Sequence, residues 1–235
     1  MKISIISPCY NESDNIEKFV YEIFKIFKKY KDFELIIIDD SSTDGTTKIL
    51  LKLVNQFKNL KVIFRSSIYR DLSLSCFQGI RKAKFKTIVI MDSDMQHQPK
   101  DVIKLYKKYK KYKSDIVVGT RSLLKRNPGL GYFRQKSSIL IILILNYFLG
   151  KRTSDPMSGF FLFNKKIYNP KNKYFSRGFK ILVDLIYGSR KKIKVNDVSI
   201  TFKLRKNNQS KMNLKVLFYI LKFIYTKKID EYFNS

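Results

Sequence analysis

The chain has 235 residues, of which 44% are hydrophobic, enough for the core of one large domain or of one domain with an extension. Its two cysteines form neither a metal-binding nor a disulfide pattern, which excludes a disulfide-stabilised extracellular domain and indicates a reducing compartment. The net charge is +29, and residues 116–229 contain only three acids, Asp155, Asp184 and Asp197. Such a field favours phosphorylated substrates, anionic lipid or nucleic acid, although an excess of Lys over Arg is also consistent with solvated surface and a compositional bias.

Strands and helices alternate through the first 120 residues. Apolar segments typical of buried strands occupy residues 3–7, 33–39, 61–65, 87–91 and 115–119. Between them, apolar residues recur at helical spacing in residues 16–27 and 49–57, and Pro99 can begin a third helix that continues to Tyr106. This alternation predicts an α/β fold with a mostly parallel sheet that helices cover on both faces. The first segment is a strand in this interpretation, since it lacks the length and cleavage site of a signal peptide.

Two apolar segments in the second half have a different character. Residues 139–149 form an apolar run interrupted only by Asn146, and residues 212–225 are apolar with lysines along one helical face. Both are too short to span a bilayer, which needs about 20 residues. We expect them to lie at a membrane surface; the alternative is a pair of core helices with a solvated lysine edge.

Acidic side chains follow two of the predicted strands. Asp92 and Asp94 come directly after the strand at 87–91, and Asp39 and Asp40 end the strand at 33–39. In an open α/β sheet the carboxyl ends of the strands form the ligand-binding edge. Paired carboxylates there suit Mg²⁺ or Mn²⁺ carrying a diphosphate. The sequence has no glycine-rich dinucleotide or P-loop motif, so carboxylates, metal and loop backbone must hold any nucleotide.

Three motifs resemble family 2 glycosyltransferases, whose nucleotide-binding fold is called GT-A. They are Pro-Cys-Tyr-Asn-Glu at 8–12, Asp-Asp-Ser-Ser-Thr-Asp-Gly-Thr at 39–46 and Met-Asp-Ser-Asp-Met-Gln-His at 91–97. The motifs at 155–161 and 205–212, with Gly119-Thr120-Arg121 and the pair Arg134 and Ser138, look like the dolichol-phosphate mannose synthases and their bacterial polyprenyl-phosphate relatives. The resemblance implies a Rossmann-like mixed sheet in a GT-A domain at 1–211, with a nucleotide part at 1–120 and an acceptor part at 121–211. A C-terminal amphipathic interfacial helix or tail would follow at 212–235.

The resemblance also implies an activity: inverting, metal-dependent transfer of a hexose from a nucleotide sugar of the GDP-mannose or UDP-glucose class to dolichyl or undecaprenyl phosphate. The implied nucleotide-sugar residues are Pro8, Tyr10, Glu12, Asp40, Asp92, Ser93 and Asp94, and the implied metal ligands are Asp92, Asp94 and Gln96. The implied acceptor-phosphate residues are Arg121, Arg134, Ser138, Arg205 and Lys211. The implied catalytic residues are Asp94, Asp155, Arg205 and Lys211.

The sequence departs from the family pattern at two positions where glycine is usual. Asn208 occupies one of them, and Asn tolerates a left-handed backbone. Asp71 occupies the other and adds a negative charge near the expected nucleotide site, which leaves the donor preference open. Many relatives carry C-terminal transmembrane helices that this sequence does not show, so we expect a peripheral enzyme on the cytoplasmic face, bound to anionic lipid or to a membrane-anchoring partner protein.

Two other functions remain open. A family 2 enzyme could transfer its sugar to a hydroxyl of a polysaccharide or lipid-linked glycan, which usually requires a catalytic base; the basic residues Arg134, Arg205 and Lys211 favour a phosphate acceptor instead. The charge alone is compatible with nucleic-acid binding. We expect no nucleic-acid partner, because most aromatic residues occupy apolar periodic positions and the acid pairs repel phosphate in the absence of metal.

Overall fold

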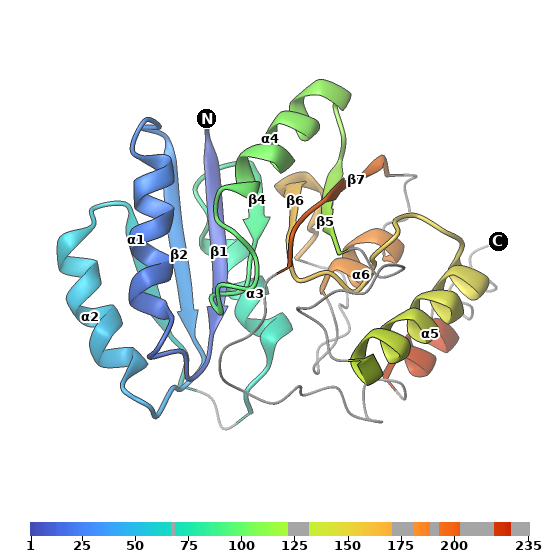
Figure 1. Cartoon of the computed structure of the whole chain (residues 1–235), viewed down its shortest axis with the longest axis horizontal. Helices are drawn as coiled ribbons and strands as arrows, with labels where there is room; N and C mark the ends of the chain where they lie inside the picture. The colour runs from blue at the N-terminus through green and yellow to red at the C-terminus, as the bar shows by residue number, and fades with distance from the viewer. Residues whose placement is uncertain (67–68, 122–131, 171–180, 189–192, 203–218, 227–235) are drawn as a thin grey trace.

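The computed structural model describes residues 1–66, 69–121, 132–170, 181–188, 193–202 and 219–226, with only the helical backbone at 132–135 and 137. One seven-stranded sheet in the order β3-β2-β1-β4-β6-β5-β7 organises these residues (Figure 1). Its strands are β1 (Ile3–Cys9), β2 (Phe33–Asp39), β3 (Leu60–Phe64), β4 (Thr87–Ile90), β5 (Ile116–Thr120), β6 (Phe161–Asn164) and β7 (Val195–Ser199). β6 is antiparallel to β4 and β5, and the other neighbouring strands are parallel. The predicted mixed, mostly parallel sheet is therefore confirmed.

Helices cover both faces of the sheet, as predicted. The helices are α1 (Ile16–Phe27), α2 (Thr46–Gln56), α3 (Leu72–Lys82), α4 (Asp101–Tyr112), α5 (Tyr132–Leu149) and α6 (Ile181–Tyr187), with a short 3-10 helix η1 (Lys165–Ile167). Buried residues of α1, α2 and α4 share one apolar cluster with one face of the sheet. Those of α3 and α6 share a second cluster with the other face. The inner strands β1, β2, β4, β5 and β6 are buried on both sides because the two clusters take alternate residues from each of them. The edge strands β3 and β7 are partly exposed.

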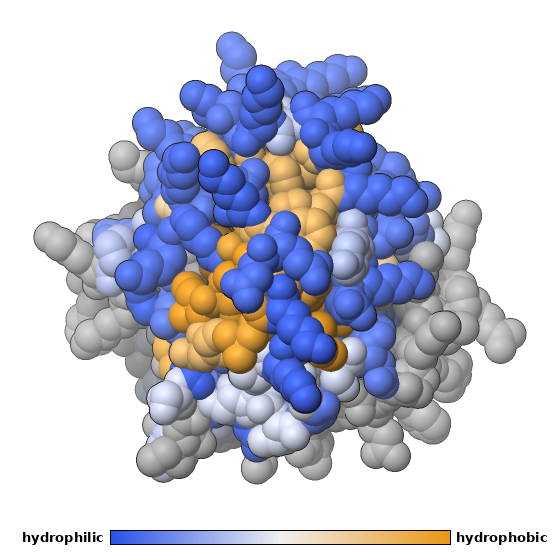
Figure 2. Space-filling model, turned by 90° about the vertical axis from the view of Figure 1, so that its left-hand side faces the viewer, coloured by the Kyte–Doolittle hydropathy of each residue, from blue (hydrophilic) through white to orange (hydrophobic). Residues whose placement is uncertain are grey.

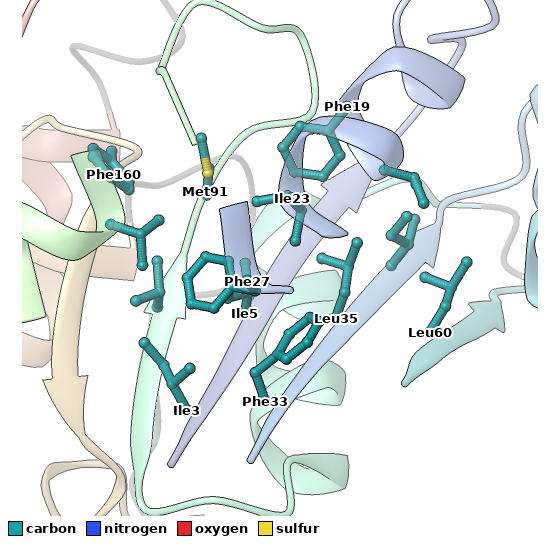
Figure 3. Close-up of a cluster of buried hydrophobic side chains, with 14 of the residues drawn as sticks. Ile3, Ile5, Phe19, Ile23, Phe27, Phe33, Leu35, Leu60, Met91 and Phe160 are labelled. Carbon is teal, nitrogen blue, oxygen red and sulfur yellow. The ribbon is translucent and has the colours of Figure 1, made fainter. Parts of the chain in front are cut away.

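The first cluster shows why the segment at 16–27 is a helix. Phe19, Ile23 and Phe27 recur along one helical face and are fully buried. They lie over Ile5 of β1 and Leu35 of β2 (Figure 3). Burying each such side chain contributes roughly 1.5–3 kcal/mol. This contact fixes α1 on the sheet and thereby fixes the loop that joins β1 to α1.

Five elements were not predicted from the sequence: α3, α6, η1, β6 and β7. The α3 segment has serines and a glycine where a strong apolar period would stand. Gly79 explains part of this, because a Cβ at this position would lie 2.5 Å from Cγ2 of Ile6. The missing side chain lets α3 approach β1 closely. β6 is a four-residue strand whose place depends on pairing with β4 and β5, which sequence periodicity does not report.

The apolar segment at 139–149 forms the larger part of α5, which packs against a second helical segment at residues 219–226. Ile141 and Leu145 of α5 are buried against Phe223, while Leu143 and Tyr147 on the same helix are 59% and 83% exposed. One face of α5 therefore packs against the protein, and another face exposes apolar side chains. No helix among the described residues combines the length and apolar character needed to cross a membrane. Residues 212–218 of the second predicted segment lie outside the described residues.

The flank of the molecule at α2 and β3 shows apolar side chains surrounded by hydrophilic ones (Figure 2). Leu51 of α2 and Phe64 of β3 are 54% and 43% exposed. A shallow hollow of about 560 Å³ is lined by aromatic residues that include Phe24, Phe33 and Phe57. Phe33 begins β2, so the hollow lies at the end of the sheet opposite the acids that follow β2 and β4.

Candidate active site

The loops that follow β1, β2 and β4 meet at the carboxyl edge of the sheet. The backbone N–H of Asp40 donates to the carbonyl of Cys9 at 2.9 Å, which joins the first two loops. The hydroxyl of Ser93 donates to the carbonyl of Pro8 at 3.3 Å, which joins the first loop to the third. The segments that carry the predicted nucleotide residues Pro8, Tyr10, Asp40 and Ser93 are therefore neighbours, although up to 85 residues separate them in sequence.

Each of these three loops contains a residue with a left-handed backbone. Asn11, Ser41 and Met95 have φ angles of 52°, 63° and 60°. For a residue with a side chain this conformation costs about 1–2 kcal/mol. Unfavourable backbone geometry of this kind concentrates at functional sites, where the surrounding structure holds it in place. The coincidence of all three at one sheet edge marks that edge as the candidate site.

Asp39 and Asp40 hold the loops in different ways. The carboxylate of Asp39 accepts hydrogen bonds from the hydroxyls of Ser42 at 2.5 Å and Thr47 at 2.6 Å, so it braces its own loop. Asp40 instead reaches towards β3 and α3. Its Oδ1 accepts from Nη1 of Arg65 at 2.8 Å, and its Oδ2 accepts from the backbone N–H of Asp71, also at 2.8 Å. Asp40 thus connects three elements, and any contact with a nucleotide base would be made by a carboxylate already oriented from both sides.

Two residues around Asp40 take roles that the sequence did not indicate. Arg65 also donates to the carbonyl of Asp71 at 3.1 Å and to the hydroxyl of Ser75 at 3.0 Å. The carboxylate of Asp71 accepts from the backbone N–H of Leu74 at 2.9 Å and caps the start of α3. The negative charge that replaces the usual glycine is therefore engaged in helix capping. Its effect on donor preference stays a prediction.

Asp92 and Asp94 lie in the loop after β4. The side chain of Asp92 is 29% exposed, and its carboxylate lies against Gly159, where a Cβ would be 2.6 Å from Oδ2. Oδ1 of Asp94 accepts from the backbone N–H of Gln96 at 3.0 Å. His97 is buried, with Nε2 3.9 Å from Oδ2 of Asp92. Its ring packs against the rings of Phe160 and Phe202 at centroid distances of 5.1 and 5.0 Å.

The donor set in this loop fits a hard divalent cation. Asp92 and Asp94 are partly exposed and supply carboxylate oxygens, the ligands that Mg²⁺ and Mn²⁺ prefer. Within the described ranges there is no group of three or more His, Cys, Asp and Glu side chains suited to hold a metal. A cation here would accordingly take further oxygens from elsewhere, as Mg²⁺ commonly does from substrate phosphates. Gln96, the third predicted ligand, is 3% exposed, and its role stays a prediction.

Arg121 and Asp155 form a buried, bidentate ion pair beside this loop. Nε and Nη2 of Arg121 donate to the two carboxylate oxygens of Asp155 at 2.7 and 2.8 Å. The arginine side chain is 8% exposed and the carboxylate is fully buried. Burial disfavours the charged guanidinium, but the hydrogen bonds and charge of Asp155, together with the charge of Asp92, raise the pKa of Arg121. Arg121 is thus permanently charged and oriented by Asp155, a pairing that the sequence did not reveal.

The remaining predicted residues are less completely placed. Glu12 is buried, and its carboxylate accepts from the side-chain amide of Asn15 at 2.8 Å. Ser138 lies on α5 and is 3% exposed. Arg134 belongs to the same helix, but its side chain is outside the described residues, as are all of Arg205 and Lys211. The acceptor-phosphate set is therefore located only at Arg121 and Ser138.

Comparison with known proteins identifies the family. The chain is 32% identical over 233 residues to the dolichol-phosphate mannosyltransferase of Pyrococcus furiosus, which covers 96% of this chain and 63% of the relative. It is also 32% identical over 233 residues to the Saccharomyces cerevisiae protein of that name, covering 92% of this chain and 83% of the relative. The glucosyl-3-phosphoglycerate synthase of Mycobacterium tuberculosis, solved with Mn²⁺, UDP and glucosyl-3-phosphoglycerate, has the same fold, with a TM-score of 0.70 and 17% identity over 97% of this chain and 79% of that one. The family model for glycosyl transferase family 2 matches residues 4–170, so the predicted family is confirmed, and the chain belongs to glycosyl transferase family 2.

Proposed function

We propose that this chain transfers a hexose, with mannose the favoured sugar, from a nucleotide sugar to a polyprenyl phosphate. The observation that carries the proposal is the placement of Asp92 and Asp94 at one sheet edge, beside both the loops of Tyr10 and Asp40 and the buried Arg121–Asp155 pair. The nucleotide would therefore lie against the loops of Tyr10 and Asp40, and the acceptor phosphate would approach from the side of Arg121 and Asp155. The names and the 32% identity of the two mannosyltransferase relatives support the choice of sugar and acceptor.

A divalent cation, Mg²⁺ or Mn²⁺, would be held by Asp92 and Asp94. When bound, it neutralises negative charge on the diphosphate, the Lewis-acid role. The mycobacterial synthase of the same fold, which was solved with Mn²⁺ and UDP together, supports this assignment. The chain's own contribution is to fix the two carboxylates: the close contact at Gly159 sets the position of Asp92, and the turn at Met95 sets that of Asp94.

The acceptor is proposed to be a phosphate monoester. An oxygen of that phosphate forms a bond to the anomeric carbon while the bond from that carbon to the donor diphosphate breaks, which inverts the configuration. A phosphate monoester is largely dianionic at pH 7, since its second pKa is about 6, and therefore needs little help from a general base. It does need positive charge, because donor and acceptor are both anionic. Arg121 and the basic residues of the acceptor part would provide it, with Asp155 keeping the guanidinium in a fixed orientation.

The enzyme is proposed to bind the cytoplasmic face of a membrane through α5 and the helical segment at 219–226. These helices share a buried cluster, so they form one unit. Their outward residues are apolar: Leu140, Leu143 and Tyr147 are 55%, 59% and 83% exposed, and Leu221 and Tyr225 are 48% and 69% exposed. Apolar side chains of this kind can enter the boundary between headgroups and acyl chains, while nearby lysines contact anionic headgroups.

Transfer with purified components tests the function. The chain is incubated with labelled GDP-mannose, UDP-glucose or UDP-N-acetylglucosamine, and with vesicles that contain dolichyl or undecaprenyl phosphate. We expect label from GDP-mannose to enter the lipid fraction, and EDTA to prevent this until Mg²⁺ or Mn²⁺ is restored. Absence of label from the lipid fraction with all three nucleotide sugars would contradict the proposal.

A further inference from the structure

We propose that Arg70 is a binding residue for the nucleotide donor and that its guanidinium contacts the donor diphosphate. This inference rests on the proposed function, because it assumes that the donor occupies the carboxyl edge of the sheet. Three observations support it. Arg70 lies on the ring of Tyr10, the backbone next to it is held by hydrogen bonds to Asp40 and Arg65, and no described carboxylate forms an ion pair with it.

Arg70 lies on the side chain of Tyr10. The carbon at the centre of its guanidinium is 4.4 Å from the centroid of the tyrosine ring, and Nη1 donates a hydrogen bond to the tyrosine hydroxyl. Tyr10 directly follows β1, between the loop of Asp40 and the loop of Asp94. A guanidinium has five N–H donors, and the tyrosine hydroxyl accepts from Nη1 alone, so the donors on the other nitrogens remain for further hydrogen bonds. Arg70 therefore presents donors between the two loops that would hold the ends of a nucleotide.

The backbone next to Arg70 is fixed to the same edge. The N–H of Asp71 donates to Asp40 at 2.8 Å, and the carbonyl of Asp71 accepts from Arg65 at 3.1 Å. α3 begins immediately afterwards, capped by the side chain of Asp71. Although the side chain of Arg70 is exposed, its attachment point is therefore held by the network around Asp40.

Among the described residues, Arg70 differs from two other arginines at this edge in the partner of its charge. Arg65 pairs with Asp40, and Arg121 pairs with Asp155. In the part of the chain that the structure describes, the contacts of Arg70 are with the neutral Tyr10, and no carboxylate forms an ion pair with it.

The loops around Arg70 are acidic, since Asp40, Asp92 and Asp94 all lie at this edge. A doubly charged diphosphate that approaches them needs positive charge other than the cation held by Asp92 and Asp94. A guanidinium matches pairs of phosphate oxygens. A diphosphate is consequently the ligand group that best matches the positive charge and the paired hydrogen-bond donors of Arg70.

The test compares Arg70→Gln with Lys82→Gln in the full chain. Lys82 is an exposed residue in the last turn of α3, so its replacement removes the same charge from the end of α3 that lies away from the carboxyl edge. Binding of GDP, UDP and the corresponding nucleosides is measured by calorimetry with Mn²⁺ present. We expect Arg70→Gln to weaken binding of the preferred nucleoside diphosphate about tenfold, in line with the loss of a charge-assisted hydrogen bond, and Lys82→Gln to change it less than about twofold. Binding of the nucleoside should not change.

Steady-state transfer provides the second measurement. Arg70→Gln should raise the KM for the nucleotide sugar and leave the KM for the polyprenyl phosphate unchanged. Equal effects of the two substitutions on diphosphate binding would overturn the inference. A loss that is as large for the nucleoside as for the diphosphate would place the contact at the base and overturn the diphosphate assignment. If the unmodified chain binds no nucleoside diphosphate and transfers no sugar, the proposed function itself fails.

Discussion

The carboxylate of Asp92 lies directly against Gly159, a residue 67 positions later in the chain, so closely that a Cβ on Gly159 would be 2.6 Å from Oδ2. Gly159 precedes β6, the antiparallel strand that joins β4 to β5 in the sheet. The contact thus connects a proposed metal-binding carboxylate to the part of the chain proposed to hold the acceptor. It gives Gly159 a role that does not depend on backbone flexibility.

Gly159→Ala is expected to displace Asp92 and reduce transfer at least about tenfold, because a misplaced catalytic group commonly costs that much or more. The double variant Gly159→Ala with Asp92→Ala should be no worse than Asp92→Ala alone, since the two changes act through one carboxylate. Transfer assays on the three variants measure the coupling. Additive losses would show that Gly159 acts elsewhere.

Asp94→Ala is expected to reduce transfer by about 100-fold or more while the chain remains folded, because it removes one of two carboxylates proposed to hold the cation. Asp32→Ala is the control: Asp32 is an exposed acid just before β2, at the opposite end of the sheet, and its loss should leave activity unchanged. Circular dichroism and transfer with titrated Mn²⁺ distinguish lost folding from lost metal affinity. Full activity of Asp94→Ala in the presence of EDTA would refute the metal assignment.

Arg121→Met is expected to destabilise the chain by about 3–5 kcal/mol, because it leaves the fully buried carboxylate of Asp155 without its partner. The double variant Arg121→Met with Asp155→Leu should recover much of this loss, since no buried charge then remains. Urea denaturation of the single and double variants gives the two free energies of unfolding. If the double variant is as unstable as the sum of the singles, the pair is not coupled as the distances indicate.

The pH dependence of stability should contain a contribution from Asp44. Partial burial raises its pKa, but hydrogen bonds from Thr46 and Ser13 outweigh that effect and lower the pKa from 3.8 to about 2. Because the pKa of the folded state is the lower one, the stabilisation is present above about pH 3.8 and disappears as the pH falls towards 2. The melting temperature of Asp44→Asn should therefore lie below that of the unmodified chain at pH 6, with the difference shrinking between pH 4 and pH 2. A difference that stays constant across this range would contradict the assignment.

Leu143→Glu should weaken binding to anionic vesicles several-fold, because it places a charge on the exposed apolar face of α5. Leu51→Glu is the matched control: Leu51 is exposed to a similar extent, 54% against 59%, but belongs to α2 on another flank. Flotation of both variants with vesicles measures the effect. Equal binding of the two variants would remove α5 from the proposed membrane surface.

The amino-acid sequence was enough to predict the first five strands, the helices α1, α2 and α4, and the positions of the acids at the strand ends. These features are local, since a strand or an amphipathic helix shows its apolar period in consecutive residues. An acid that follows a parallel strand must lie at the carboxyl edge whatever the rest of the chain does. The motifs that identified the family are also runs of consecutive residues, so their order and spacing can be read without knowledge of the fold.

Which charges and side chains meet at that edge depends on how the chain folds. Asp40 pairs with Arg65, Arg121 pairs with Asp155, Tyr10 lies beneath Arg70, and Asp92 lies against Gly159. Each contact joins residues at least 25 positions apart and depends on the order of the strands. The contact between Asp92 and Gly159 depends as well on the reversed direction of β6. Residue types and local periodicity contain no information about such distances. The contacts follow from the way the sheet places its loops. They alone show that Arg65 and Arg121 are paired with carboxylates, whereas no described carboxylate forms an ion pair with Arg70.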